Sequence, residues 1–165
     1  MTDAASSVHD QFRLGRRLAH RRVAGSDLGD ELPAGARRAA RSFLACARPE
    51  ILDNALVVTV ELVTNAATHG CGLVDLVMDL YDHGFTVEVR DRGDSVESLL
   101  RCAKRAVTRN NDMEGWSVDA VLAAIGEGGR GLLLVEEMST SWDVRRCPGG
   151  KAVRATIAYP QAVAS

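Results

Sequence analysis

Aromatic residues are scarce in this sequence, since phenylalanine, tryptophan and tyrosine together make up only 4% of its 165 residues. Aliphatic side chains and alanine must therefore supply the hydrophobic core, and a chain of this length can bury a substantial core in one domain. The remaining composition, 46% hydrophobic and 25% charged, is that of an ordinary globular protein. We therefore expect one globular domain.

Cysteine is also sparse, and no two cysteines form a C-x-x-C pair. The four stand far apart in the sequence, at Cys46, Cys71, Cys102 and Cys147. Zinc sites and disulfide scaffolds usually need closely spaced or numerous cysteines. We therefore expect reduced thiols that are buried or incidental.

The chain has little net charge and no apolar run long enough to cross a bilayer. A formal net charge of −2 argues against a general nucleic-acid binder. The first 17 residues lack the positively charged start and apolar stretch of a secretory signal. The sequence thus predicts a cytoplasmic protein with no membrane segment and no direct contact with nucleic acid.

The first 32 residues show little apolar pattern. Residues 12–22 carry five arginines and one histidine, and a basic arm of this kind could bind nucleic acid or an acidic partner. A solvated, weakly structured segment is the simpler interpretation. Residues 23–32 are rich in glycine and aspartate and predict a loop or a weak edge strand.

Apolar spacing predicts two helices between residues 32 and 68. The first covers 32–47, with Pro33 in its first turn and arginines on its solvent side. Pro49 separates it from the second, which begins at Glu50. Gly70, at the end of the second helix, is a typical C-terminal signal.

The apolar period then changes from helical to two, which predicts strands. Residues 74–80 and 85–89 form an expected antiparallel hairpin with one solvated face, and residues 141–146 and 152–159 form another. Between the hairpins lie a long connection over 94–128, with possible short helices at 96–106 and 118–125, and an apolar helix over 132–138. Strands in adjacent pairs predict an α+β two-layer sandwich, with a mixed or antiparallel sheet covered by helices on one face.

The second helix carries the first group of candidate functional residues. Glu61 and Asn65 lie four residues apart on one helical face, and His69 follows one turn later. An amide oxygen suits Mg²⁺ with its bound phosphates. A carboxylate one turn away could orient or deprotonate an attacking hydroxyl or water.

Two further stretches carry chemistry of the same kind. Asp91 and Gly93 follow the second strand of the first hairpin, where a buried carboxylate can accept a hydrogen bond from an exocyclic amine and glycine lets a ligand approach. Residues 128–131, sequence GGRG, open a helix whose free N–H groups suit polyphosphate. Each stretch alone is weak, but the three in this order predict a nucleotide site.

The order of these stretches resembles that of a known superfamily. ELVTNAATHG, VRDRG, GGRGLLLV and GGKAVRA follow one another as in the GHKL (Bergerat-fold) ATP-binding superfamily, which includes DNA gyrase and histidine kinases. Within it, the sequence is most similar to the small RsbW/SpoIIAB-like branch, anti-sigma factors that are serine/threonine protein kinases, and especially to its single-domain actinobacterial members. The resemblance covers roughly residues 33–158.

The resemblance implies a role for each matching position. Glu61 matches the general base, Asn65 the Mg²⁺ ligand, and Asp91 the residue that binds the adenine amino group. The other implied nucleotide contacts are His69, Gly93, Gly129, Arg130, Gly131 and Leu132. The implied ATP-binding domain spans 33–160, with an ATP lid over 94–128, a weakly structured segment over 1–32 and a tail over 161–165.

Four features depart from the branch, and the first is a lid that is longer than in the compact kinases. Ala152 stands where a threonine usually lies near adenine, Glu127 precedes the glycines, and residues 1–32 show no equivalent of the first strand, which lies at the dimer interface in this branch. The implied cofactors are ATP and Mg²⁺. The implied partners are a sigma factor and a STAS-domain antagonist, with a possible homodimer.

Two functions therefore stay open at this point. One is an anti-sigma regulatory factor that also phosphorylates its STAS-domain antagonist on serine. The other is a regulatory binding module whose ATP site is weak or vestigial. The ATPase part of a histidine kinase is disfavoured, because His9 and His20 do not lie in a convincing phosphoacceptor helix.

Overall fold

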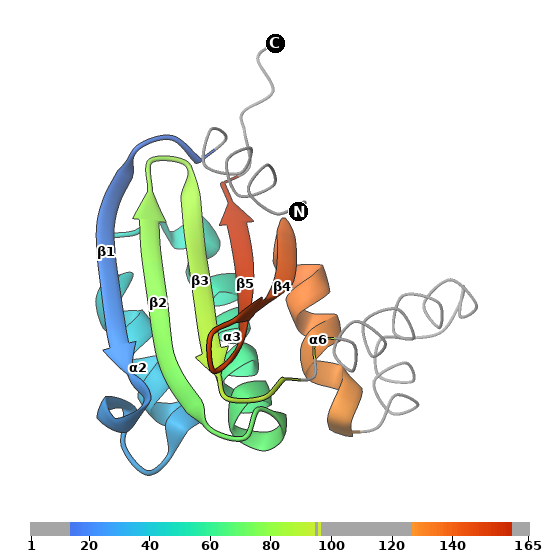
Figure 1. Cartoon of the computed structure of the whole chain (residues 1–165). Helices are drawn as coiled ribbons and strands as arrows, with labels where there is room; N and C mark the ends of the chain where they lie inside the picture. The colour runs from blue at the N-terminus through green and yellow to red at the C-terminus, as the bar shows by residue number, and fades with distance from the viewer. Residues whose placement is uncertain (1–13, 95, 97–126, 160–165) are drawn as a thin grey trace, which may run out of the picture.

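One antiparallel sheet organises the chain. The computed structural model describes residues 14–94, 96 and 127–159, and Figure 1 shows the sheet with its helices on one face. In chain order the elements are β1 (Arg17–Ala24), the 3-10 helix η1 (Gly25–Leu28), α2 (Leu32–Phe43), α3 (Pro49–His69), β2 (Leu73–Tyr81), β3 (Gly84–Asp91), α6 (Glu127–Met138), β4 (Ser141–Cys147) and β5 (Gly150–Ala158). The five strands lie in the order β1-β2-β3-β5-β4. The predicted α+β sandwich is confirmed, and its sheet is antiparallel throughout the described strands.

The helices form where the apolar spacing predicts them, with small shifts at their ends. Helix α2 ends at Phe43 rather than residue 47, and the N–H of Leu44 bonds the Ala40 carbonyl at its end. Helix α6 begins at Glu127, so the glycine-rich segment lies in its first turns and not before it.

Helix α3 is the central helix of the fold. By length and composition it could cross a membrane, with a mean hydropathy of 1.2, so the expectation that no segment is long and apolar enough is wrong. Its apolar side chains instead pack into the core, among them Val58, Leu62 and Val63, each at most 2% exposed. Helix α3 is therefore the core helix of a globular domain.

The first hairpin has the predicted strands but an unexpected bulge. The pairing register between β2 and β3 shifts between Leu73 and Asp75, so Val74 is an extra residue on its strand. The sequence predicts Val74 on the core face, yet it is 37% exposed, whereas Leu73 is buried. The alternation along β2 is regular only after the bulge.

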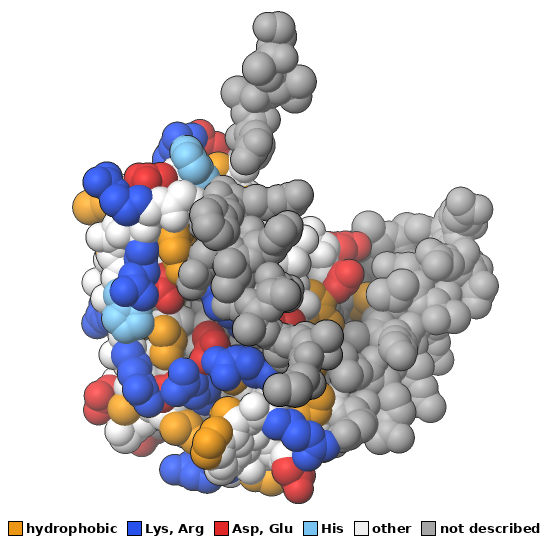
Figure 2. Space-filling model, turned by 45° about the horizontal axis from the view of Figure 1, so that its top comes forward, with side chains coloured by type: hydrophobic (Ala, Val, Ile, Leu, Met, Phe, Trp, Pro, Cys, Tyr) orange, Lys and Arg blue, Asp and Glu red, His pale blue; other side chains and the backbone are white. Residues whose placement is uncertain are grey.

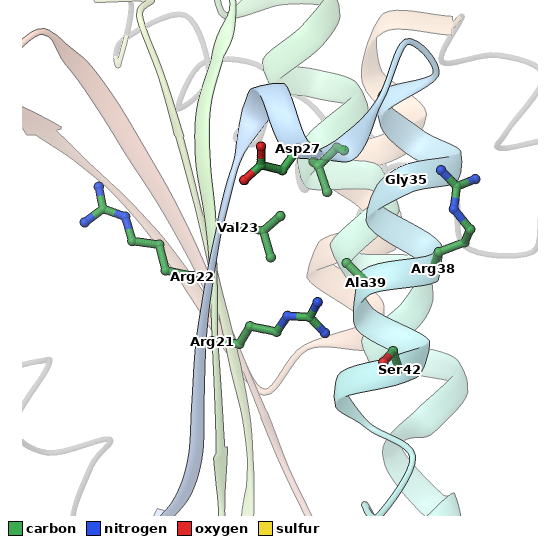
Figure 3. Close-up of a pocket in the computed structure, with 9 residues that line it drawn as sticks. Arg21, Arg22, Val23, Asp27, Gly35, Arg38, Ala39 and Ser42 are labelled. Carbon is green, nitrogen blue, oxygen red and sulfur yellow. The ribbon is translucent and has the colours of Figure 1, made fainter.

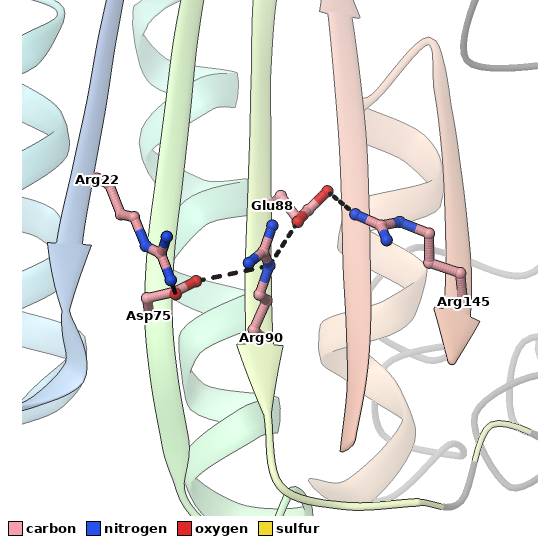
Figure 4. Close-up of polar contacts among 5 residues, drawn as sticks. All are labelled: Arg22, Asp75, Glu88, Arg90 and Arg145. Carbon is pink, nitrogen blue, oxygen red and sulfur yellow. Dashed lines mark hydrogen bonds and ion pairs between the residues drawn. The ribbon is translucent and has the colours of Figure 1, made fainter. Parts of the chain in front are cut away.

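The outer face of the sheet, which the sequence predicts to be solvated, carries a row of ion pairs (Figure 4). Asp75 pairs with Arg22 from β1 and, at 3.8 Å, with Arg90 from β3. Glu88 accepts hydrogen bonds from Arg90 Nε at 2.9 Å and from an Arg145 terminal nitrogen at 2.8 Å. This row therefore links β1, β2, β3 and β4 on the face without helices.

The basic segment before residue 32 contributes a strand, so the expectation that it holds no first strand is wrong. Strand β1 pairs antiparallel with β2 at one edge of the sheet. Val23 is its single buried residue, while Arg17 and His20 bond Asp79 at 3.2 and 2.7 Å. Figure 2 shows basic side chains gathered along this edge with acidic side chains among them. Charge pairing therefore replaces apolar alternation in this strand.

Several predicted segments lie outside the described residues. These are residues 1–13, the tail over 161–165, and the predicted lid over 94–128 except for Asp94, Val96, Glu127 and Gly128. The predicted helices at 96–106 and 118–125 fall in the same part of the chain.

Candidate functional site

The polar stripe of α3 faces the beginning of α6. A Cβ atom added to Gly131 would lie 2.6 Å from Glu61 Oε2 and 3.3 Å from Asn65 Oδ1, closer than side chains pack. Glycine at this position lets the α6 backbone approach both polar groups. The structure thus brings together the predicted general base, the predicted metal ligand and one of the predicted phosphate-binding glycines.

Glu61 lies half-buried between these helices. Burial raises the pKa of its carboxyl above the ordinary value of 4.5, because the partly apolar surroundings disfavour the charged form. Among the described residues, none offers this carboxylate a hydrogen bond or an ion pair. A carboxylate with a raised pKa is a stronger proton acceptor than an ordinary carboxylate.

Asn65 has a polar atom without a partner. Its Nδ2 is buried and has no hydrogen-bond partner among the described residues. A buried polar group in this state costs free energy that a ligand can recover. A half-turn about the last side-chain bond exchanges nitrogen and oxygen, so the same position can present the amide oxygen.

These residues fit a magnesium nucleotide. Mg²⁺ prefers oxygen ligands, keeps several waters, and is commonly bound by one or two side chains together with phosphates. Asn65 can supply an amide oxygen, and the glycine at position 131 brings the α6 backbone close to it. Within the described ranges no three His, Cys, Asp or Glu side chains lie together as a metal-binding cluster. An ion held largely by phosphates does not require such a cluster.

Asp91 forms the second part of the site. It ends β3 with only 3% of its surface exposed, and its Oδ1 accepts a hydrogen bond from the Gly93 N–H at 2.8 Å. A Cβ on Gly70 would lie 2.5 Å from Asp91 Cγ. The end of α3 therefore packs directly on this carboxylate, and only glycine fits there.

Lys151 is the site residue that sequence reasoning missed. Its Nζ lies 2.8 Å from Asp91 Oδ1, and both side chains are almost fully buried. The two residues are direct cross-strand partners in β3 and β5. The alternation of Val153, Ala155 and Ile157 into the core would have placed Lys151 on the same face.

Ala152 lies on the other face of the sheet. It pairs with Arg90 on one side and Arg145 on the other, and directly opposite residues project from the same face. The interpretation that an alanine here removes a contact near adenine is therefore corrected. The residue beside Asp91 is Lys151, one position earlier.

The two parts of the site are joined by α3. Glu61 and Asn65 lie against α6, and Gly70, just past the helix, lies against Asp91. A rise of 1.5 Å per residue separates Glu61 from His69, at the end of the helix, by about 12 Å along the helix axis. An elongated ligand can therefore place one end at Asp91 and the other at Glu61.

The structure gives the position of the remaining predicted residues but, within its described part, no side-chain hydrogen bond or ion pair between them and the other site residues. His69 is exposed at the end of α3, next to Gly70 in the sequence. Leu132 is buried in α6. Gly129 and Arg130 lie in the first turn of α6, and their surroundings are outside the described side chains.

A pocket of about 360 Å³ lies elsewhere, between β1 and α2 (Figure 3). Its lining includes Arg21 and Val23 from β1 and Arg38 and Ser42 from α2. It contains none of the predicted site residues, and strands β2 and β3 separate β1 from β5. The pocket is therefore distinct from the site along α3.

The sequence profile of the histidine kinase-like ATPase domain matches residues 27–157. The chain belongs to this family. The resemblance to the GHKL superfamily is thereby confirmed, and with it a nucleotide-binding fold. The matched region begins at Asp27, whereas the sequence predicts that the domain begins at residue 33.

A solved structure supports the same fold. A chain in the crystal structure of the SiaB–SiaC complex from Pseudomonas aeruginosa is similar to this histidine kinase-like ATPase domain, with a TM-score of 0.55 and 17% sequence identity. The match covers 94% of this chain and 97% of that chain. At this identity the likeness concerns the fold alone. No curated protein sequence matches the chain.

Proposed function

We propose that this protein is an ATP-dependent regulatory kinase of the anti-sigma type. It binds Mg·ATP along α3, transfers the γ-phosphoryl group to a serine of a STAS-domain antagonist, and sequesters a sigma factor when that antagonist is phosphorylated. The observation that carries the proposal is the placement of Glu61 and Asn65 against Gly131, with Asp91 buried at the other end of the same helix.

The transfer step follows from these positions. The serine oxygen forms a bond to the γ-phosphorus while the bond from that phosphorus to the bridging oxygen breaks, and ADP leaves. Glu61 accepts the hydroxyl proton, a role for which its raised pKa is favourable. Asp91 holds the adenine ring. The N–H groups at the start of a helix attract phosphate, so the start of α6 would bind the phosphates.

Mg²⁺, when bound, would neutralise phosphate charge beside Asn65. The amide oxygen of Asn65 would hold the ion, because Mg²⁺ prefers oxygen ligands. An Asn65→Ala variant should therefore lose nucleotide affinity in the presence of Mg²⁺.

A transfer assay with labelled ATP and candidate STAS-domain proteins tests the proposal. Glu61→Ala should abolish phosphorylation of the antagonist and keep nucleotide binding, because Glu61 acts on the serine hydroxyl of the antagonist and not on the adenine of ATP. Glu137→Ala, an exposed glutamate on α6, is the matched control and should transfer normally. Undiminished transfer by Glu61→Ala would reject Glu61 as the general base, and no transfer by the wild-type protein to any candidate would reject the kinase assignment.

The partners are part of the proposal. The structural neighbour comes from a two-protein complex, which supports a role in binding another protein. We expect a sigma factor and a STAS-domain antagonist as partners, a cytoplasmic location, and a homodimer. Pull-downs with candidate sigma factors test the first expectation, and light scattering tests the last.

A second candidate is a binding module with a weak or vestigial ATP site. The ion pair between Lys151 and Asp91 favours this binding module, because Lys151 already occupies one oxygen of the carboxylate proposed to bind adenine. Calorimetry with Mg·ATP separates the two candidates. Affinity weaker than millimolar would leave only the binding role.

A further inference from the structure

The ammonium group of Lys151 is buried with most of its hydrogen-bonding capacity unused. Lys151 is 4% exposed, and its Nζ donates to Asp91 Oδ1 at 2.8 Å. An ammonium group has three N–H donors, and among the described residues Asp91 is the single acceptor that it meets. Buried donors without acceptors are costly. A bound ligand that presents an acceptor at this position would satisfy one of them.

The neighbouring atoms fix where such a ligand would lie. Asp91 Oδ1 is shared by Lys151 and the Gly93 N–H, both at 2.8 Å, which leaves Oδ2 for another donor. A Cβ on Gly93 would lie 2.7 Å from Lys151 Nζ and 3.0 Å from Asp91 Oδ1. The backbone of Gly93 therefore packs directly against both the ammonium and the carboxylate, and a larger residue would displace them. The site presents an acceptor and a donor side by side.

We propose that Lys151 is a base-recognition residue, which donates a hydrogen bond to the ring nitrogen next to the exocyclic amine that Asp91 binds. This inference rests on the proposed function, because it takes the ligand to be a purine nucleotide with its base at Asp91. Adenine presents a donor, its 6-amino group, beside an acceptor, N1. The acceptor of Asp91 and the donor of Lys151 match these two groups in order.

The same arrangement rejects guanine. In the same orientation guanine places its O6 acceptor against the Asp91 carboxylate and its N1–H donor against the Lys151 ammonium. Both contacts would be repulsive, and specificity often depends on such mismatches. Lys151 therefore contributes to nucleotide choice as well as to affinity.

A purely structural ion pair is the alternative. The cross-strand position of the two residues brings their side chains together whether or not a base is bound. However, a buried ion pair seldom stabilises a fold more than an apolar pair of similar size. A role for Lys151 in ligand binding gives a reason for a cation at this position that stability alone does not.

Calorimetry with modified nucleotides tests the contact atom by atom. The ligands are ATP, its 1-deaza analogue, in which N1 is replaced by C–H, and purine riboside triphosphate, which lacks the 6-amino group. The wild-type protein should bind 1-deaza-ATP roughly tenfold or more weakly than ATP, as expected for a lost hydrogen bond to a charged donor. Lys151→Met should bind ATP and 1-deaza-ATP equally.

Further measurements separate this contact from other effects. The loss for purine riboside triphosphate should persist in Lys151→Met, because Asp91 remains. Lys151→Gln, which keeps an N–H donor, should restore part of the preference for ATP and serves if the methionine variant does not fold. Arg154→Met, on the same strand but paired with residues of the outer face, is the matched control and should behave as wild type.

Two results would overturn the inference while leaving the proposed function intact. One is equal wild-type affinity for ATP and 1-deaza-ATP, and the other is an undiminished preference for ATP in both Lys151→Met and Lys151→Gln. A wild-type protein that binds none of the nucleotides would instead reject the proposed function.

Discussion

At the scale of single residues, Glu61 should lower the stability of the fold that it serves. Burial raises its pKa in the folded protein, so the folded state binds this proton more tightly than the unfolded state does. The contribution of Glu61 to the free energy of unfolding is therefore favourable in acid, and it is lost as pH rises through the ordinary pKa of 4.5 toward the raised pKa. Glu61→Gln should therefore melt at a higher temperature than wild type at pH 7.

Thermal denaturation across pH measures this effect. The difference in melting temperature between Glu61→Gln and wild type should shrink toward zero at pH 4, where the wild-type carboxyl is protonated. Glu137→Gln, at an exposed position on α6, should show no such trend. A glutamine variant that is less stable than wild type at pH 7 would contradict the assignment of Glu61 as a desolvated base. Stability gained at the cost of transfer is a common trade-off at functional sites.

The residues of the site differ in how far the sequence could predict them. Glu61 and Asn65 were predictable because a helix fixes which residues share a face, and Gly131 beside them was predictable from the motif. Lys151 was not predicted, because the motif aligns Ala152 and not Lys151 with the residue near adenine. Strand alternation and register decide which residue faces Asp91. The contact depends on pairing between residues 60 positions apart, which one sequence does not display.

At the scale of elements, the long periodic segments were predictable and the edge strand was not. Helices α2 and α3 and both hairpins follow apolar spacing that is visible in the sequence. Strand β1 buries only Val23. It lies at the edge of a sheet that is covered on one face, so most of its positions meet solvent and can carry charged side chains. The bulge at Val74 was equally hidden, since the extra residue is defined by its partner strand.

The ion pairs of the outer face should make stability depend on acid pH. Burial alone would raise the pKa of Glu88, but hydrogen bonds and charge attraction from Arg145 and Arg90 outweigh it and lower that pKa. A lowered folded pKa contributes stability above the ordinary value of 4.5 that is lost as pH falls through the folded pKa. Glu88→Gln should therefore cost about 1–2 kcal/mol at neutral pH and little in strong acid.

Urea denaturation at several pH values checks this expectation. Arg145→Met keeps Glu88 and its bond to Arg90, so its loss of stability at pH 7 should be smaller than that of Glu88→Gln. A cost for Glu88→Gln that does not change between pH 7 and pH 3 would show that the pairs contribute through shape and not through charge.

At the scale of the whole molecule, the site is assembled from elements far apart in the sequence. Helix α3 supplies Glu61 and Asn65, strand β3 supplies Asp91, α6 supplies Gly131 and β5 supplies Lys151. Strand β3 lies at the centre of the sheet and β1 at its edge. The described site residues therefore come from elements other than β1, and damage to β1 should act on stability before it acts on the site.

A chain that begins at residue 25 tests the contribution of β1. Its removal takes Val23 out of the core and leaves the buried Asp75 without Arg22, and the same truncation also removes the buried Leu14, which precedes the strand. The loss of apolar burial and of a partner for a buried charge should together cost about 3 kcal/mol or more, a large share of a typical domain's stability. In the shortened chain Asp75→Asn should cost less than in the full chain, because the carboxylate has already lost one of its two arginines. Equal urea midpoints for the full and shortened chains would mean that β1 only covers the edge of a sheet that is stable without it.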